Sequence, residues 1–185
     1  MIYNLPTSLT VGGTEYEIRT DFRDILDILE ISNDTEINEQ ERYWLSLLFF
    51  YTDFQNMPEQ DYREALEKCY WFINGGQNEN PKNKNAPRLM DWEKDFPYII
   101  APINRVIGRE IRADKHLHWW TFLSAYMEIG ECTLAQIVHI RDCKRQGKKL
   151  TDFDKEWYRK NRDIVDLAPK YTAKDNELFE KLGGV

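Results

Sequence analysis

The N-terminal part of the chain alternates between polar and apolar positions, which is the pattern of β-strands. Two such runs flank Gly12 and Gly13, and the second covers residues 14–19. Two glycines between alternating runs supply the positive φ angles of a tight hairpin turn. A two-stranded hairpin is marginally stable alone in water. We therefore predict a β-hairpin in which Tyr16 and Ile18 pack on a helix or pair with another chain.

From residue 21 onward the apolar residues recur every three or four positions, which predicts a series of helices. Good capping residues stand before several of them, and Asn38 with Glu41 and Thr133 with Gln136 resemble capping boxes. In chain order, helices are predicted after Asp21, from Asn38 to about Tyr51, from Pro58 to Ile73 before Asn74-Gly75-Gly76, over about 91–106, from near Asp114 to Gly130, from Thr133 to Gly147, and from Thr151 to Pro169.

Two of these helices have unusual sequences. The apolar residues of 39–51 surround most of the helix axis, so we expect this helix at the centre of the molecule. Pro97 and Pro102 lie within the segment 91–106, where each removes a backbone donor. We expect a kinked helix or two short helices there.

The remaining segments define the organisation of the chain. Residues 77–90 are polar and rich in asparagine, which predicts a flexible loop. We therefore expect a hairpin over 1–20 packed on a helical domain over 21–167, and a C-terminal tail over 168–185 with a short helix at about 173–181. The fold class is mainly α, a bundle of about six to eight helices with a short N-terminal β-hairpin.

Aromatic residues make up 14% of the chain, and six of them are tryptophans. Most lie in strongly apolar segments and are expected in the core. The neighbours Trp119 and Trp120 point about 100° apart on a helix, so burying both requires contact over a wide arc. Because aromatic residues also dominate binding hot spots, some are candidates for a structural or partner-binding role. The candidates are Trp44, Trp71, Trp92, Trp119, Trp120 and Phe122.

Charge is unevenly distributed along the chain. The net charge is −7, and residues 1–60 hold 3 basic and 12 acidic residues, against 22 and 20 in residues 61–185. Because phosphate binding needs positive potential, we expect no nucleic-acid partner. No apolar run approaches the roughly 20 residues of a membrane helix, and no signal peptide is present, so we expect a cytoplasmic protein that does not bind membranes. Its three cysteines should be reduced thiols.

Few side chains suggest catalysis or metal binding. His139 and Cys143 share a helix face, and Cys132, His116 and His118 are further possible zinc ligands. Neither C-x-x-C nor H-E-x-x-H occurs, so we expect no metal and no cofactor. A nucleophilic Cys143 with His139 as base lacks an orienting third group, and no phosphate-binding or hydrolase motif is found. We expect the protein not to be an enzyme.

A basic stretch near residue 145 completes the candidates. It contains Arg141, Lys144, Arg145, Lys148 and Lys149. Positive charge near a helix C-terminus interacts favourably with the helix dipole. We interpret these residues as structural, with contact to a protein or to nucleic acid as the alternatives.

Three segments together resemble the bacteriophage gene product 15 family. They are the opening from Leu5-Pro6 to Phe22-Arg23, the helix containing Glu64-Ala65-Leu66 and Trp71-Phe72-Ile73, and the motif Leu117-His118-Trp119-Trp120-Thr121-Phe122. The acidic segment 91–95 stands where the family has an aspartate-rich helix. The resemblance covers about residues 3–165. Pro97 and Pro102 depart from it, and so does the tail.

The resemblance implies a phage or prophage protein encoded among tail genes near the tape measure, with no catalytic residues to carry over. It further implies a tail assembly chaperone that binds the tape measure protein in the bacterial cytoplasm, with self-association as an open possibility. A structural tail component retained in the virion is the main alternative. A metal-dependent enzyme built on His139 and Cys143 is a remote one.

Overall fold

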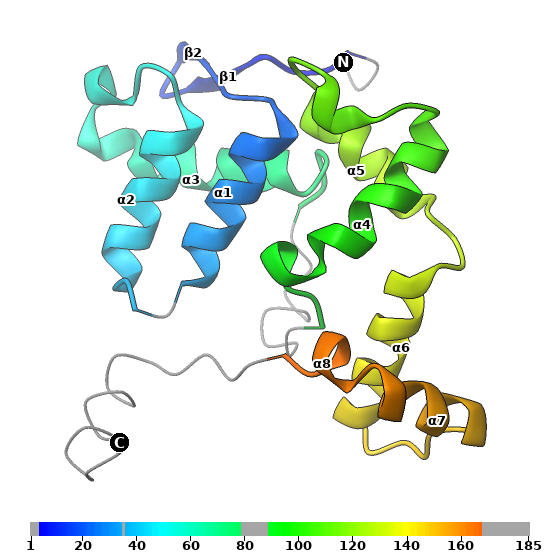
Figure 1. Cartoon of the computed structure of the whole chain (residues 1–185). Helices are drawn as coiled ribbons and strands as arrows, with labels where there is room; N and C mark the ends of the chain where they lie inside the picture. Colours follow the sequence, from blue (N-terminus) through cyan, green and yellow to red (C-terminus); the bar gives the residue numbers. More distant parts are fainter. Residues whose placement is uncertain (1–3, 35, 79–88, 168–185) are drawn as a thin grey trace, which may run out of the picture.

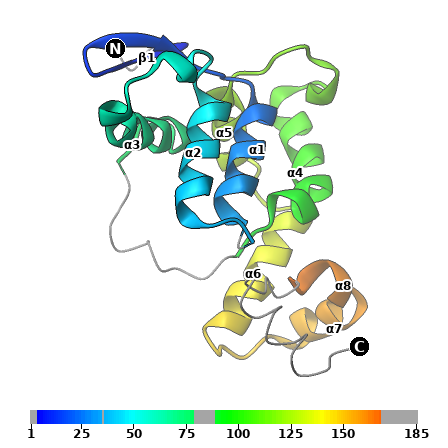
Figure 2. The ribbon, with the colours of Figure 1, turned by 90° about the vertical axis from the view of Figure 1, so that its left-hand side faces the viewer.

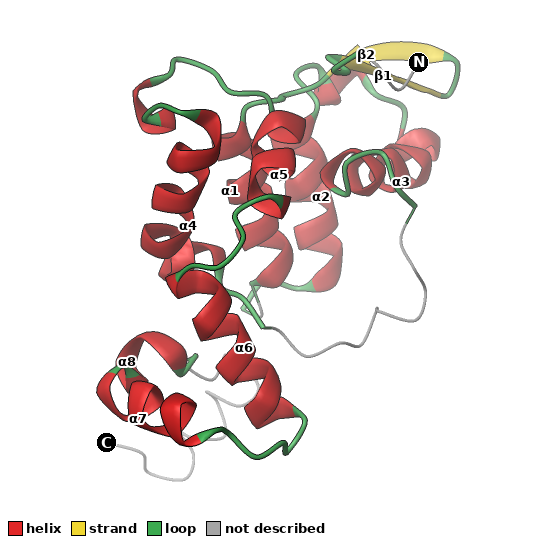
Figure 3. Ribbon diagram, turned by 90° about the vertical axis from the view of Figure 1, so that its right-hand side faces the viewer, coloured by secondary structure: helices red, strands yellow, loops and turns green. Residues whose placement is uncertain are grey.

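The computed structural model describes residues 4–34, 36–78 and 89–167. Within these ranges it contains a two-stranded antiparallel sheet and eight α-helices. Figures 1 and 3 show the hairpin at one end of the molecule, above the helices α1 to α5, with α6 leading away to α7 and α8. The predicted mainly α-helical fold with an N-terminal hairpin is confirmed. The expected helix at 173–181 and most of the expected loop at 77–90 lie outside the described residues.

The hairpin forms where the glycine pair predicts it. Strands β1 (Ser8–Val11) and β2 (Thr14–Glu17) pair with Val11 opposite Thr14. Gly12 and Gly13 have φ angles of 57° and 83°, the positive values that a two-residue primed turn needs. The apolar side of the hairpin packs on the helices, and the ring of Tyr16 lies 6.1 Å from that of Tyr51.

The helices α1 (Phe22–Asn33) and α2 (Glu39–Phe50) lie side by side, with α3 (Tyr62–Ile73) crossing them (Figures 1 and 2). The predicted caps are present, because the side chains of Asp21 and Asn38 accept from the backbone N–H groups of Arg23 and Glu41. The predicted start of the third helix at Pro58 is wrong. Pro58 precedes a 3₁₀ turn, and α3 begins at Tyr62.

The segment with two prolines forms one helix, α4 (Trp92–Ile107), so the alternative of two short helices is wrong. Asp91 caps its N-terminus, and Gly108 ends it with a φ of 81°. Each proline leaves one helical carbonyl without its usual donor. Packing against its neighbours α1, α5 and α6 supports the helix despite this loss.

The starts of the next two helices differ from the prediction. α5 (Trp119–Met127) begins after the capping residue His118, because residues 111–118 form a 3₁₀ turn and an extended stretch. α6 (Thr133–Arg145) is preceded by Cys132, which makes no side-chain capping bond. The capping box predicted at Thr133 is therefore wrong, because Thr133 is already inside the helix.

The last described helices are α7 (Asp152–Lys160) and α8 (Arg162–Val165). Thr151 and Asp154 form a reciprocal capping box at the start of α7, which confirms the predicted cap. The predicted single helix from Thr151 instead breaks at Asn161. Ile137 and Ile140 of α6 pack against Val165 in a small second cluster.

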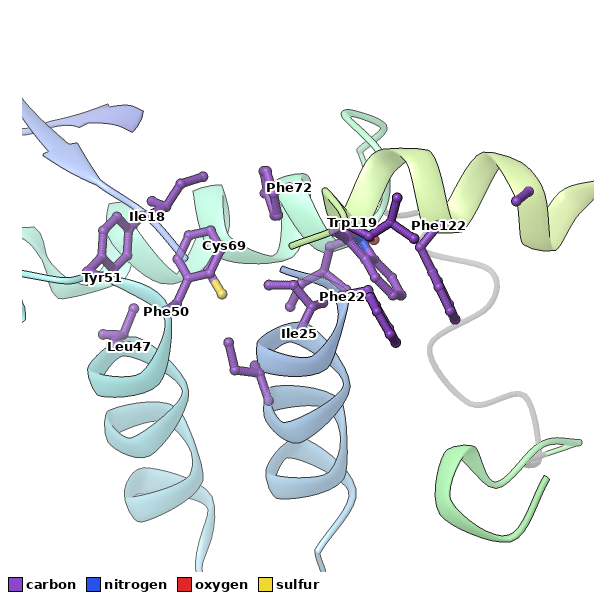
Figure 4. Packing of buried hydrophobic residues seen from close by; sticks show 14 of the residues in the cluster. Ile18, Phe22, Ile25, Leu47, Phe50, Tyr51, Cys69, Phe72, Trp119 and Phe122 are labelled. Carbon is purple, nitrogen blue, oxygen red and sulfur yellow. The ribbon is translucent and has the colours of Figure 1, made fainter. Parts of the chain in front are cut away.

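The main core lies between the hairpin and α1 to α5. Figure 4 shows side chains from α1, α2, α3 and α5 meeting there. Phe22 of α1 stacks on Phe122 of α5 with ring centroids 4.8 Å apart, and Phe50 of α2 lies 5.3 Å from Phe72 of α3. Contacts between residues far apart in sequence thus join the five helices.

Candidate functional site

The six candidate aromatic residues divide into a buried network and one exposed residue. Trp119 and Phe122 are buried, and Trp71, Trp92 and Trp120 are partly buried beside them. Four contacts link these rings: Trp71 to Trp120 at 5.6 Å, Phe122 to Trp119 at 5.5 Å, and Trp92 to Trp119 and Phe122 at 6.3 and 6.5 Å. Trp92 also lies 5.4 Å from Tyr126. Trp44 lies apart from this network and is 47% exposed, so its expected place in the core is wrong.

Trp119 and Trp120 donate hydrogen bonds to the C-terminal end of a neighbouring helix, α3. The indole N–H of Trp119 donates to the carbonyl of Ile73 at 2.8 Å, and that of Trp120 donates to the carbonyl of Phe72 at 2.8 Å. Both acceptors lie in the last turn of α3, where carbonyls have no partner within the helix. The prediction that both tryptophans are buried holds for Trp119, while Trp120 is half-buried.

The three segments that carry the family resemblance meet at one place. The carboxylate of Asp21 accepts from the backbone N–H of Leu117 at 2.8 Å, and the N–H of Phe22 donates to the Leu117 carbonyl at 3.0 Å. The N–H of Trp119 donates to the Thr20 carbonyl at 2.7 Å. With the Trp119 and Trp120 bonds to α3, these contacts tie the opening segment, α3 and α5 together. The shared residues build the fold here.

His118 completes this junction. Its Nδ1 accepts from the N–H of Trp120 at 3.1 Å, and its Nε2 lies 3.0 Å from the carbonyl of Pro6, to which it donates. The ring is therefore neutral with its hydrogen on Nε2. Burial lowers the pKa of His118, the nearby His116 lowers it further, and the bond to Pro6 opposes both.

Arg141 and Lys144 of the predicted basic stretch are held in ion pairs. Arg141 is buried and donates from both terminal nitrogens to the carboxylate of Asp95, which is fully buried. Its remaining N–H groups donate to the carbonyls of Leu89, Ile164 and Val165. Lys144 pairs with Asp166 at 2.5 Å. The buried pair of Arg141 with Asp95 was not predicted from the sequence, although Asp95 belongs to the acidic segment 91–95.

The candidate metal ligands are not gathered in one site. His116 lies 2.9 Å from the hydroxyl of Thr20, and His118 is held at Pro6. Cys143 Sγ is 3.7 Å from His139 Nε2, and the same nitrogen lies 3.6 Å from Asp154. In residues 4–34, 36–78 and 89–167 no group of three histidine, cysteine, aspartate or glutamate residues is placed to hold a metal ion. In a catalytic arrangement the carboxylate would hold the second ring nitrogen of the histidine. Asp154 instead lies near His139 Nε2, the same nitrogen that faces Cys143 Sγ, so it does not orient the ring for catalysis.

The outward side of α2 carries exposed apolar residues. α2 packs against α1, α3 and the 3₁₀ turn Phe54–Asn56, and Figure 2 shows it at the front of the molecule. On the rest of its circumference lie Trp44, Leu45, Leu48 and Phe49, with Phe49 37% and Trp44 47% exposed. We call these four residues the outer face of α2. The predicted central position of this helix is wrong, because only one side of it is buried.

An open groove lies between α1, α2 and α3. It has a volume of about 930 Å³. Leu29 of α1, Tyr43 of α2 and Leu66, Tyr70 and Trp71 of α3 are among its lining residues. Tyr43 points about 100° away from Trp44, so on α2 the groove borders the side that faces α1 and α3. Among the described helices, none has the length and apolar character needed to cross a bilayer.

Comparison with protein families agrees with the resemblance seen in the sequence. The family described as bacteriophage Gp15 protein matches residues 1–167, which include every element described above. Comparisons with curated proteins and with solved structures gave no match. The match covers most of the chain and includes all three segments that meet at the junction. The chain therefore belongs to the bacteriophage Gp15 protein family.

Proposed function

We propose that this protein is a tail assembly chaperone that binds the tape measure protein in the cytoplasm of the bacterial host. The observation that carries the proposal is the outer face of α2, where Trp44 and Phe49 are exposed beside two leucines. A solvent-facing helix side is normally polar, and a continuous exposed apolar surface marks an interaction site. Protein binding is the function that this surface supports best.

The chemistry of the surface suits a chaperone. Indole and phenyl rings provide large contact areas without demanding one hydrogen-bonding pattern, so they accept many related apolar segments. Residues 1–60, which include α2, hold 12 acidic and 3 basic residues, and this excess of negative charge would keep a loaded complex soluble. Family membership supports a phage role, and the tape measure is the long tail protein that needs protection before the tail tube forms.

Co-expression tests the proposal. The tape measure gene of the same phage is expressed alone and together with this protein, and the soluble fraction of the tape measure is measured. We expect the tape measure to be soluble only in the co-expression and to co-purify with this protein. Mass spectrometry of purified virions provides the second measurement. A tape measure that stays insoluble, together with this chain as a fixed component of virions, would overturn the chaperone role in favour of a structural one.

A further inference from the structure

The groove between α1, α2 and α3 has the shape of a helix-binding site. Leu66, Tyr70 and Ile73 form one row along α3, and Glu67, Trp71 and Asn74 form the next. Such rows at spacings of three and four residues are the ridges between which a second helix packs. One turn of a helix with a radius of about 5 Å occupies roughly 400 Å³. The groove volume of about 930 Å³ therefore corresponds to about two turns.

The charge of the groove selects among the helices that would fit. Glu39 of α2 and Glu67 of α3 line it, and none of the residues described around it is a lysine, arginine or histidine. The side chain of Glu39 accepts from the Tyr43 hydroxyl, and Glu67 lies 3.3 Å from Arg63 on the outside of α3. Arg63 and Glu67 are both largely exposed, so their pair is weak and leaves Glu67 available to an incoming cation.

A second copy of this chain is a poor occupant. Its own first third has 12 acidic and 3 basic residues, so the corresponding surface of another copy would repel the groove. A partner helix with an apolar stripe would instead cover Leu29, Leu66 and Tyr70. Lysine or arginine on its flanks would reach Glu39 and Glu67.

We infer that this groove binds an amphipathic helix with basic flanks. The inference rests on the proposed function, because it identifies how the chaperone would hold a segment of its partner. It also defines that segment: leucine-like residues at positions i, i+3, i+4 and i+7, with lysine or arginine beside them.

Calorimetric titration of the full chain with two synthetic peptides tests the inference. Each peptide has about 18 residues and leucine along one face, and the flanks are lysine in one and glutamate in the other. We expect the lysine peptide to bind at least about tenfold more tightly at low salt, and the difference to shrink as salt increases. Equal binding of the two peptides would overturn the inference.

Charge reversal locates the site. The variant Glu39→Lys/Glu67→Lys should lose about tenfold in affinity for the lysine peptide. The control Glu128→Lys/Glu131→Lys changes the net charge equally at two exposed residues between α5 and α6, and should bind as the unmodified protein does. An equal loss in the control, or a dimer in light scattering that the groove reversal dissociates, would overturn the assignment. Because the peptides are synthetic, this result is independent of whether the co-expression test succeeds.

Discussion

Arg141 and Asp95 form a two-pronged ion pair in the interior, with N–O distances of 2.6 and 2.9 Å. Arg141 belongs to α6 and Asp95 to the first turns of α4. The same guanidinium donates to the carbonyls of Ile164 and Val165 in α8. One side chain thus connects three helices, and all of its N–H groups have acceptors.

Removing one partner of this pair should be strongly destabilising. Arg141→Met leaves the Asp95 carboxylate buried without its cation, which typically costs about 3–5 kcal/mol. The control Lys160→Met breaks the exposed pair with Glu156 and should cost less than about 1 kcal/mol. Urea denaturation measures both, and Asp95→Leu/Arg141→Met should recover part of the loss. Similar stability of the two single variants would contradict the structural role of the pair.

The two tryptophans should differ in their effects. Trp119→Ala removes a fully buried ring and should cost about 3–5 kcal/mol, or roughly 10 °C in melting temperature. Trp120→Ala should cost less, because this ring is half-buried and its acceptor, the Phe72 carbonyl, also receives the N–H of Gly75 at 3.0 Å. Thermal melts followed by circular dichroism compare the variants. A Trp119→Ala protein that melts like the unmodified one would refute the core assignment.

The outer face of α2 should matter more for binding than for stability. Trp44→Ser/Phe49→Ser should lower the free energy of unfolding by less than the about 3–5 kcal/mol of a buried aromatic, because Trp44 is 47% and Phe49 37% exposed. In co-expression the same variant should leave the tape measure insoluble. The matched control is Met127→Ser/Phe153→Ser, which removes two apolar side chains that are 67% and 69% exposed elsewhere. If the control variant leaves the tape measure equally insoluble, the loss is a general effect of surface polarity, and the prediction for the outer face of α2 is contradicted.

His118 should make the fold sensitive to mild acid. Burial lowers its pKa below the usual 6.5, so the unfolded chain takes up a proton at a higher pH than the folded chain does. The stability that neutral His118 provides is therefore present above pH 6.5 and is lost as the pH falls from there towards the lower folded pKa. His118→Asn keeps an N-cap acceptor for Trp120 and removes the titration. Its melting temperature should fall less than that of the unmodified protein between pH 7.5 and 5.0, and an equal fall would contradict the prediction.

Local features could be predicted from the sequence, because their partners lie a few residues apart. The turn at Gly12-Gly13 and the caps at Asp21, Asn38 and Thr151 depend on backbone angles and on bonds that span two or three residues. The approximate number of helices also follows from local patterns. The family could be predicted because the three matching segments are short stretches of sequence. Of the candidate residues, the local pattern placed Trp119 correctly in the core.

Only the tertiary structure decided which side of each helix is covered. Periodicity indicated an apolar helix at 39–51 but not that its neighbours cover one side and leave Trp44 exposed. The burial of Arg141 depends on Asp95, which is 46 residues away, and on carbonyls of α8. The groove exists because α1, α2 and α3 approach without closing on one another. These properties arise from contacts between distant segments, and the spacing of residues along one helix contains no information about what lies opposite.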